Sequence, residues 1–142
     1  MSLDPLCDLN WLAVLAATFA YFALGGIWYA PPVFGNVWMK AAGLEMSADD
    51  GGPGAAIYVS PLVGAFVASV ATAMLAAATG SDTGGEGVAL GLVVGIGYAV
   101  SILGVTATFE SNKPQPTTWA VITAGYHAVG LLVASIILSS WT

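Results

Sequence analysis

NWLAVLAATFAYFALGGIWYAPPVFGNVWMK, residues 10–40, is the stretch that decides the fold of this chain. Its residues 11–29 carry no charge, and a helix of that length rises roughly 28 Å, close to the thickness of a bilayer's hydrocarbon core. Two prolines then end the helix, because proline lacks the amide hydrogen that continues the helical ladder. The stretch therefore predicts a membrane-spanning helix over residues 11–29, around which we expect the remaining helices to pack.

The segment after the prolines predicts a second, shorter helix that lies along the membrane surface. Its apolar residues recur every three to four positions and form one stripe: Phe34, Val37, Trp38, Ala41 and Leu44. Asn36 and Lys40 turn away from that stripe. A plain loop remains the alternative. Residues 45–54, EMSADDGGPG, are rich in acids and turn residues and indicate a linker.

Three further apolar runs predict spans over about residues 55–79, 88–109 and 118–139. The chain has 142 residues, of which 58% are hydrophobic and only 7% charged. A water-soluble domain is usually about a quarter charged, so this composition excludes a soluble fold. We therefore expect an all-α fold, a single transmembrane domain over residues 1–142. It is a bundle of four transmembrane helices with a short interfacial helix between the first two.

The charge pattern bears on partners and on orientation. The net charge of −6, with two lysines and no arginine, argues against nucleic acid, which needs clustered basic residues. Lys40 and Lys113 both fall in connections on the side opposite the termini. The positive-inside rule then places both termini of this multi-pass cell-membrane protein outside the cytoplasm. The acidic start has no positive region typical of a cleavable signal peptide, so we interpret the first run as a span.

Polar side chains at similar depth predict a polar centre inside the bundle. Counting from the helix ends places them near mid-membrane, where lipid offers no hydrogen-bond partner: Tyr21, Ser69, Tyr98, Ser101 and His127. We expect them to face inward and converge. His127 is the only histidine and can change charge near neutral pH. It is either a proton relay, a constriction or a haem or chlorin ligand, or a neutral group that holds the bundle in register.

Three other features of the sequence suggest roles in lining a mouth, in helix packing and in anchoring the helices at the membrane interface. Glu110 closes the third span and is expected either to pair weakly with Lys113 or to line a cytoplasmic mouth. Gly87, Gly91 and Gly95 form a ridge of small residues that favours close helix packing, within the bundle or between chains. Aromatic residues at the ends of helices are interpreted as interface anchors: Trp11, Trp28, Tyr29, Trp38, Trp119 and Trp141.

The first span and its aromatic turn resemble a known family. The residues that carry the resemblance are Asn10-Trp11-Leu12-Ala13-Val14, the pattern Gly25-x-x-Trp28-Tyr29-x-Pro31-x-x-Phe34-Gly35-x-x-Trp38-Met39, and Gly125-Tyr126-His127. The chain is similar to a family of small prokaryotic four-helix membrane proteins called domain of unknown function 1761. The resemblance implies the fold and supplies no mechanism, since the family has no established activity.

Two function classes follow from these features. The first is a small channel or carrier for protons or small solutes, lined by the polar centre. The second is a structural or accessory subunit that packs on a larger membrane complex through the glycine ridge. Self-association through the same ridge into a homo-oligomer is a separate expectation. We expect no enzyme, because no Ser-His-Asp set and no paired carboxylates lie in a span. The single cysteine, Cys7, and the lone histidine give no metal site, and we expect no cofactor.

Overall fold

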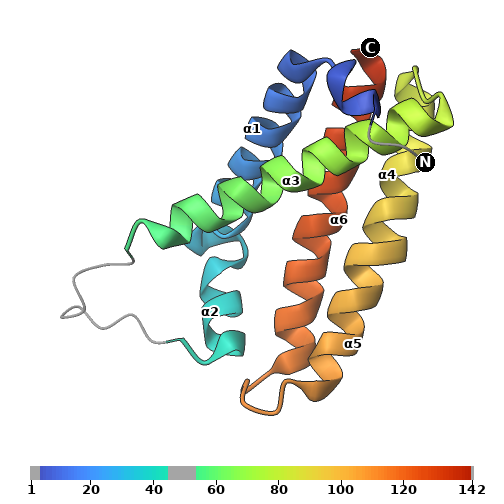
Figure 1. Ribbon diagram of the computed structural model, residues 1–142. Helices are drawn as coiled ribbons and strands as arrows, with labels where there is room; N and C mark the ends of the chain where they lie inside the picture. Colours follow the sequence, from blue (N-terminus) through green and yellow to red (C-terminus); the bar gives the residue numbers. More distant parts are fainter. Residues whose placement is uncertain (1–3, 45–53, 142) are drawn as a thin grey trace.

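Helix α1 (Trp11–Trp28) begins where Asn10 caps it, its side-chain oxygen accepting a hydrogen bond from the amide of Ala13 at 3.1 Å. The computed structural model describes residues 4–44 and 54–141, with a 3-10 turn at Asp4–Cys7. Asn10 also donates from Nδ2 to the carbonyl oxygen of Trp141 at 3.1 Å. The start of α1 therefore lies beside the end of the last helix, at what we call the termini end of the bundle (Figure 1).

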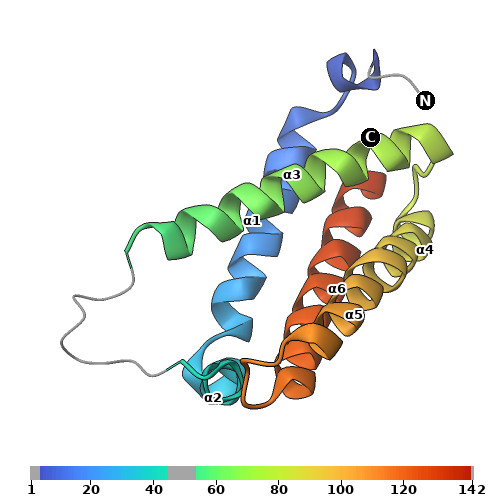
Figure 2. The same cartoon turned by 60° about the horizontal axis from the view of Figure 1, so that its bottom comes forward.

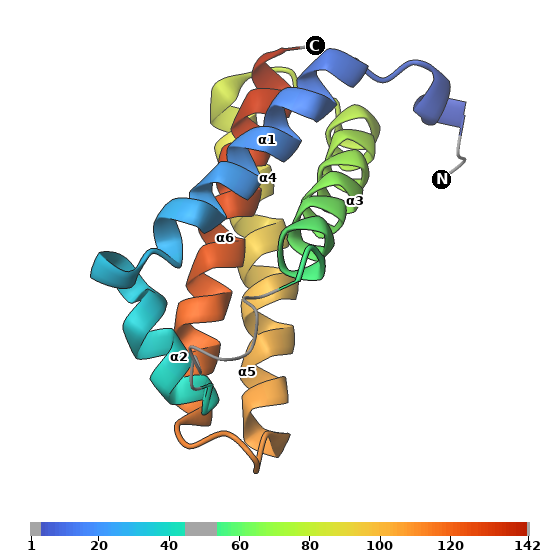
Figure 3. The same ribbon diagram turned by 90° about the vertical axis from the view of Figure 1, so that its left-hand side faces the viewer.

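A wide turn connects α1 to the short helix α2 (Asn36–Ala42). The intervening π-helical turn, Pro31–Gly35, is closed by the Gly35 amide donating to the carbonyl of Ala30 at 3.1 Å. Helix α2 lies beside the lower half of the last helix (Figure 3). At its end, the amide of Gln115 donates to the Ala41 carbonyl at 3.2 Å. The linker predicted at residues 45–54 lies, except for Gly54, outside the described residues.

Helix α3 (Ala56–Thr79) crosses the bundle obliquely and reaches the termini end (Figure 2). The next helix, α4 (Gly84–Val94), begins four residues before the predicted residue 88. The cause is a capping box, in which the Glu86 amide donates to Thr83 Oγ1 at 3.3 Å and Glu86 Oε2 accepts from the Thr83 amide at 3.1 Å. A π-helical segment (Gly95–Val100) joins α4 to α5 (Ser101–Phe109) in one continuous helix.

Helix α6 (Pro116–Ser140) is the centre of the bundle. It contacts α1, α2, α3, α4 and α5, and Figure 3 shows it enclosed between α1, α2 and the α4–α5 helix. The prediction that the first span is the centre is therefore wrong. Small residues on α6 explain the difference, because glycines and alanines let several neighbouring helices approach one backbone closely.

Four helices of the described residues are long and apolar enough to cross a membrane: Trp11–Trp28, Ala56–Thr79, Gly84–Phe109 and Pro116–Ser140. They agree with the predicted spans to within four residues, and a shorter helix lies between the first two as expected. The described residues form helices and no strand. The all-α membrane fold is confirmed.

The glycine ridge packs against α6 of the same chain. A Cβ atom placed on Gly87 would lie 2.8 Å from Ile136 Cα, and one on Gly91 would lie 2.7 Å from Leu132 Cα. A Cβ on Gly95 would lie 3.1 Å from Ala128 Cα. All three glycines are buried. The interpretation of the ridge as a seam toward another chain or a larger complex is therefore wrong, because α6 occupies that surface.

Candidate functional site

Tyr21 and His127 meet in the middle of two spans. Tyr21 Oη lies 2.6 Å from His127 Nδ1, joining the middle of α1 to the middle of α6. In one tautomer the phenol donates to an unprotonated Nδ1, and in the other the Nδ1 hydrogen is donated to the phenol oxygen. Tyr21 is buried and His127 partly buried. The contact therefore holds two groups that can exchange a proton directly at mid-membrane depth.

Two glycines on facing helices make room for this pair. A Cβ atom on Gly130 of α6 would overlap the Tyr21 ring. A Cβ on Gly25 of α1 would lie 3.1 Å from the Tyr126 hydroxyl, which donates to the Tyr21 carbonyl at 3.4 Å. Each helix thus receives a tyrosine of the other beside a glycine: Gly130 leaves space that any Cβ atom would fill, and Gly25 lets Tyr126 approach more closely than an ordinary Cβ contact. This reciprocal packing fixes the relative height of α1 and α6 and so places Tyr21 against His127.

An aromatic cluster lies between the pair and the end of the bundle that holds the α5–α6 connection, which we call the loop end. The Tyr29 ring centroid is 5.3 Å from that of Tyr126 and 5.2 Å from that of Trp38. The Trp28 and Phe34 centroids are 4.8 Å apart. Both indoles are anchored to α6: Trp28 Nε1 donates to the Ile122 carbonyl at 3.1 Å, and Trp38 Nε1 to Thr123 Oγ1 at 3.0 Å. The cluster packs on the loop-end side of the pair.

The interface anchors divide into two groups. Trp11 and Trp141 are exposed at the termini end, as an interface position requires. The other four, Trp28, Tyr29, Trp38 and Trp119, are only partly exposed. They make protein contacts, so packing explains their places as well as the interface does.

Ser69 lies on the buried face of α3. It is 0% exposed, and its Oγ has no hydrogen-bond partner among the described residues. Its neighbour on the same face, Ala65, packs with Tyr21 and Tyr126. The structure thus places Ser69 one helical turn from Ala65, which packs with Tyr21. Ser135 and Ser139 on α6 are likewise buried without a partner in the described chain.

Tyr98 and Ser101 do not reach the polar centre. Tyr98 is 64% exposed and Ser101 is also exposed, its hydroxyl donating to the Ile96 carbonyl at 3.1 Å. The expectation that they converge with His127 is wrong. The reason is the π-helical segment Gly95–Val100, which inserts an extra residue and rotates the following face by about 100°. Ala99 and Leu103 take the inward positions instead.

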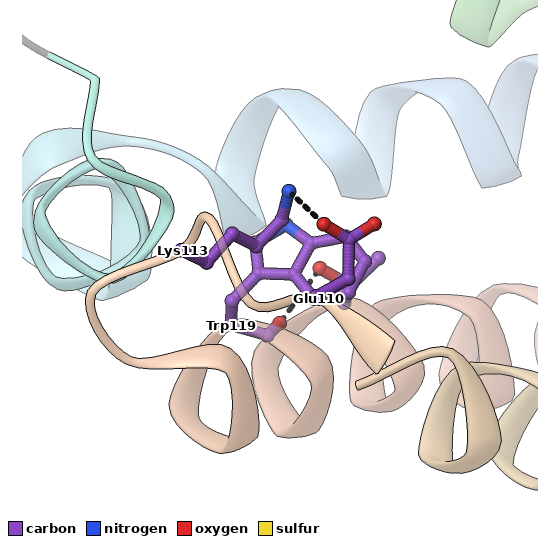
Figure 4. Close-up of polar contacts among 4 residues, drawn as sticks. Glu110, Lys113 and Trp119 are labelled. Carbon is purple, nitrogen blue, oxygen red and sulfur yellow. Dashed lines mark hydrogen bonds and ion pairs between the residues drawn. The ribbon is translucent and has the colours of Figure 1, made fainter. Parts of the chain in front are cut away.

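Glu110 pairs with Lys113. Lys113 Nζ lies 3.1 Å from Glu110 Oε2 and 4.6 Å from the centroid of the Trp119 ring, and Figure 4 shows the three side chains together. Glu110 lines neither the cavity at the termini end nor the groove between α5 and α6. Of the two expectations for Glu110, the structure shows the i,i+3 ion pair.

The two depressions lie at opposite ends. A cavity of about 260 Å³ opens at the termini end. Its lining includes Asp8, Asn10, Ala13, Ala73, Asp82 and Leu138. An apolar groove of about 430 Å³ runs between α5 and α6 near the loop end and is lined by small residues such as Gly104 and Ala124. No group of three His, Cys, Asp or Glu side chains that could hold a metal lies within residues 4–44 and 54–141.

The family comparison covers all of the helices that build this site. The chain matches a family model described as "Protein of unknown function (DUF1761)" over residues 12–139. The chain belongs to this family. No curated protein matches the chain, and no solved structure matches it. The DUF1761 assignment confirms the resemblance seen in the sequence and carries no activity with it.

Sequence reasoning missed the residues that shape the site, namely Gly25, Tyr126 and Gly130. A signal was present for two of them, because the Gly25 and Gly125-Tyr126-His127 segments carried the resemblance to DUF1761. The structure brings these two segments together: Gly25 faces Tyr126, and a Cβ on Gly125 would lie 3.1 Å from the Trp28 ring. Gly130 stood in an apolar run with nothing to distinguish it.

Proposed function

We propose that this DUF1761 protein is a small proton carrier or channel whose centre is the Tyr21–His127 pair. The observation that carries the proposal is the 2.6 Å contact between Tyr21 Oη and His127 Nδ1 in the middle of two spans. An ionisable side chain at that depth is costly to keep and is a functional hypothesis by default. Imidazole changes charge near neutral pH, and the phenol can deliver or take the proton at Nδ1.

The geometry favours protons over larger solutes. Tyr98, Ser101 and Glu110, which were expected to line a wider path, lie away from the pair. Tyr21, Tyr126 and His127 fill the centre with rings whose centroids are 4.8–6.1 Å apart. A proton passes along hydrogen bonds and needs no open pore. The proposal is for a non-enzymatic protein, with both termini outside the cytoplasm.

The test is proton flux in liposomes that contain the purified protein and a pH-sensitive dye. We expect an imposed pH gradient to collapse through the wild type, and His127→Ala and Tyr21→Phe to slow that collapse at least about tenfold. Tyr98→Phe removes a phenol hydroxyl on the exposed side and should leave the rate unchanged. Thermal unfolding of each variant separates lost conduction from lost fold. A wild-type rate equal to that of empty liposomes would refute the proposal.

A second candidate, an accessory subunit, is favoured by the outer face of α5. None of its residues is buried, and large apolar side chains project from it, with Phe109 79% exposed. Lipid covers such a face of a spanning helix by default, and in an accessory subunit a helix of the larger complex or another copy of the chain replaces the lipid there.

Placing a photo-cross-linking residue at Val105 in native membranes tests the second candidate. A discrete cross-linked protein is expected there and not at Leu12, an equally exposed position on α1. A product of twice the chain's mass would identify a homo-oligomer. Cross-linking to lipid alone at both positions would exclude the accessory role at this face.

A further inference from the structure

The direct path from the cavity at the termini end to the Tyr21–His127 pair leads through closely packed and mostly small side chains. Ala13, Ala73 and Leu138 line the cavity and belong to the packed cluster that also contains Val14, Ala17 and Ala134. Ala65, Tyr21 and Tyr126 form the next cluster. On α3, Ala73 and Ala65 are eight residues apart, a rise of roughly 12 Å. About two helical turns therefore separate the cavity from the pair.

Ser69 stands halfway along that path. It lies four residues from Ala73 and four from Ala65 on the same buried face of α3. Its hydroxyl is fully buried without a partner among the described residues. Burying an unpaired hydroxyl is unfavourable, and internal water is the usual partner of such groups.

On the opposite side, aromatic rings pack against the pair, and the groove between α5 and α6 reaches Gly125, two residues from His127. Tyr126, Tyr29 and Trp38 stack edge to face from the pair toward the loop end. Both lysines also lie beyond that cluster, whereas the cavity at the termini end carries the carboxylates of Asp8 and Asp82. Carboxylates at a cavity mouth raise the local concentration of cations, including hydronium.

We propose that Ser69 is the step by which protons pass between the cavity at the termini end and the Tyr21–His127 pair. The inference rests on the proposed function. The Ser69 hydroxyl takes a proton from hydronium on the cavity side, which is left as water, and gives up its own proton toward Tyr21. Tyr21 gains that proton and passes its phenol proton to His127 Nδ1. Serine and tyrosine are left as they began, and the imidazole carries one added proton.

The direct test is proton flux through Ser69→Ala, which keeps the small volume and removes the hydroxyl. The flux should fall at least tenfold relative to the wild type, while Ala71→Ser, an exposed site on the same helix, should leave it unchanged. Wild-type flux retained in Ser69→Ala would overturn the role of Ser69.

A measurement that needs no flux tests access to Ser69. In a Cys7→Ser background, Ser69→Cys is exposed to Ag⁺ in the liposomes, and unreacted thiol is then labelled after denaturation. We expect Cys at position 69 to react at least tenfold faster than Cys introduced by Ala71→Cys, which faces lipid. Equal slow reaction at both positions would overturn the proposal, because the interior at Ser69 would be dry.

Two bulky substitutions test from which end of the bundle water and Ag⁺ reach position 69. Ala77→Trp fills the cavity at the termini end, and Thr117→Trp fills the groove near the loop end; both residues are exposed. We expect only Ala77→Trp to slow the Ag⁺ reaction at position 69. Slowing by Thr117→Trp alone would overturn the inference. If the wild type conducts no protons, the proposed function fails, yet fast reaction at position 69 would still establish a water path to Ser69.

Discussion

Gly91→Leu is expected to separate α4 from α6 and to lower the thermal unfolding midpoint by about 10 °C or more. Even a Cβ atom on Gly91 would lie 2.7 Å from Leu132 Cα and 3.3 Å from Ser135 Cβ. The obstacle is backbone, which cannot rotate away as a side chain can. A leucine therefore forces the two helices apart along the length of the glycine ridge, and we expect a loss of about 3 kcal/mol or more.

The matched control is Gly104→Leu on the continuation of the same helix. A Cβ atom at Gly104 meets nothing within 4 Å, so the leucine projects outward and should leave the midpoint within a few degrees of the wild type. Both variants are compared by thermal unfolding in the same detergent, with the intrinsic fluorescence of the tryptophans as the signal. Equal midpoints for Gly91→Leu and the wild type would contradict the close packing of α4 on α6.

The spans were predictable because their signal is carried by composition. Each of the four helices is long enough and apolar enough to be recognised without knowledge of its neighbours. The residues at the ends of the helices changed the predicted bounds only where their side chains cap a helix. The Thr83–Glu86 capping box is such a case, because it starts the helix at Gly84, four residues before the predicted start at residue 88.

The depth of a polar side chain in the membrane was predictable from the sequence, but the helix face on which it lies was not. Counting along regular helices placed Tyr21, Ser69 and His127 at similar depth, and the structure holds the first and last of these in contact. The same counting gave Tyr98 and Ser101 the right height and the wrong face, because no sequence signal marked the π-helical segment between residues 95 and 100. A single extra residue in a helix rotates the direction of every side chain that follows it.

Close packing was the least predictable feature, because a glycine notch exists only in relation to the side chain that enters it. The spacing of Gly87, Gly91 and Gly95 indicated close packing but not which helix supplied the partner. The ridge could therefore be interpreted as an outer seam until α6 was found on it. Gly130 has no such repeat, and its role depends on Tyr21, which lies more than a hundred residues away.

Gly130→Val is expected to displace the Tyr21 ring and break its contact with His127. A Cβ atom at this position would overlap the ring, and valine adds two further carbons that its stiff side chain cannot move aside. We expect a loss of about 1–3 kcal/mol of stability. If the Tyr21–His127 pair conducts protons, flux should fall at least about tenfold, as in Tyr21→Phe.

Gly26→Val is the control for this effect, since a Cβ atom on Gly26 meets nothing within 4 Å. This variant makes the same glycine-to-valine substitution, at the position next to Gly25. We expect its stability and its proton flux to stay near those of the wild type. The informative comparison is Gly130→Val with Tyr21→Phe. Tyr21→Phe keeps the aromatic ring beside Gly130 and removes only the hydroxyl. It should therefore reduce the proton flux while the thermal unfolding midpoint falls little. Loss of stability in Gly130→Val without loss of flux would show that the contact between Tyr21 and His127 holds the helices in register and does not move protons.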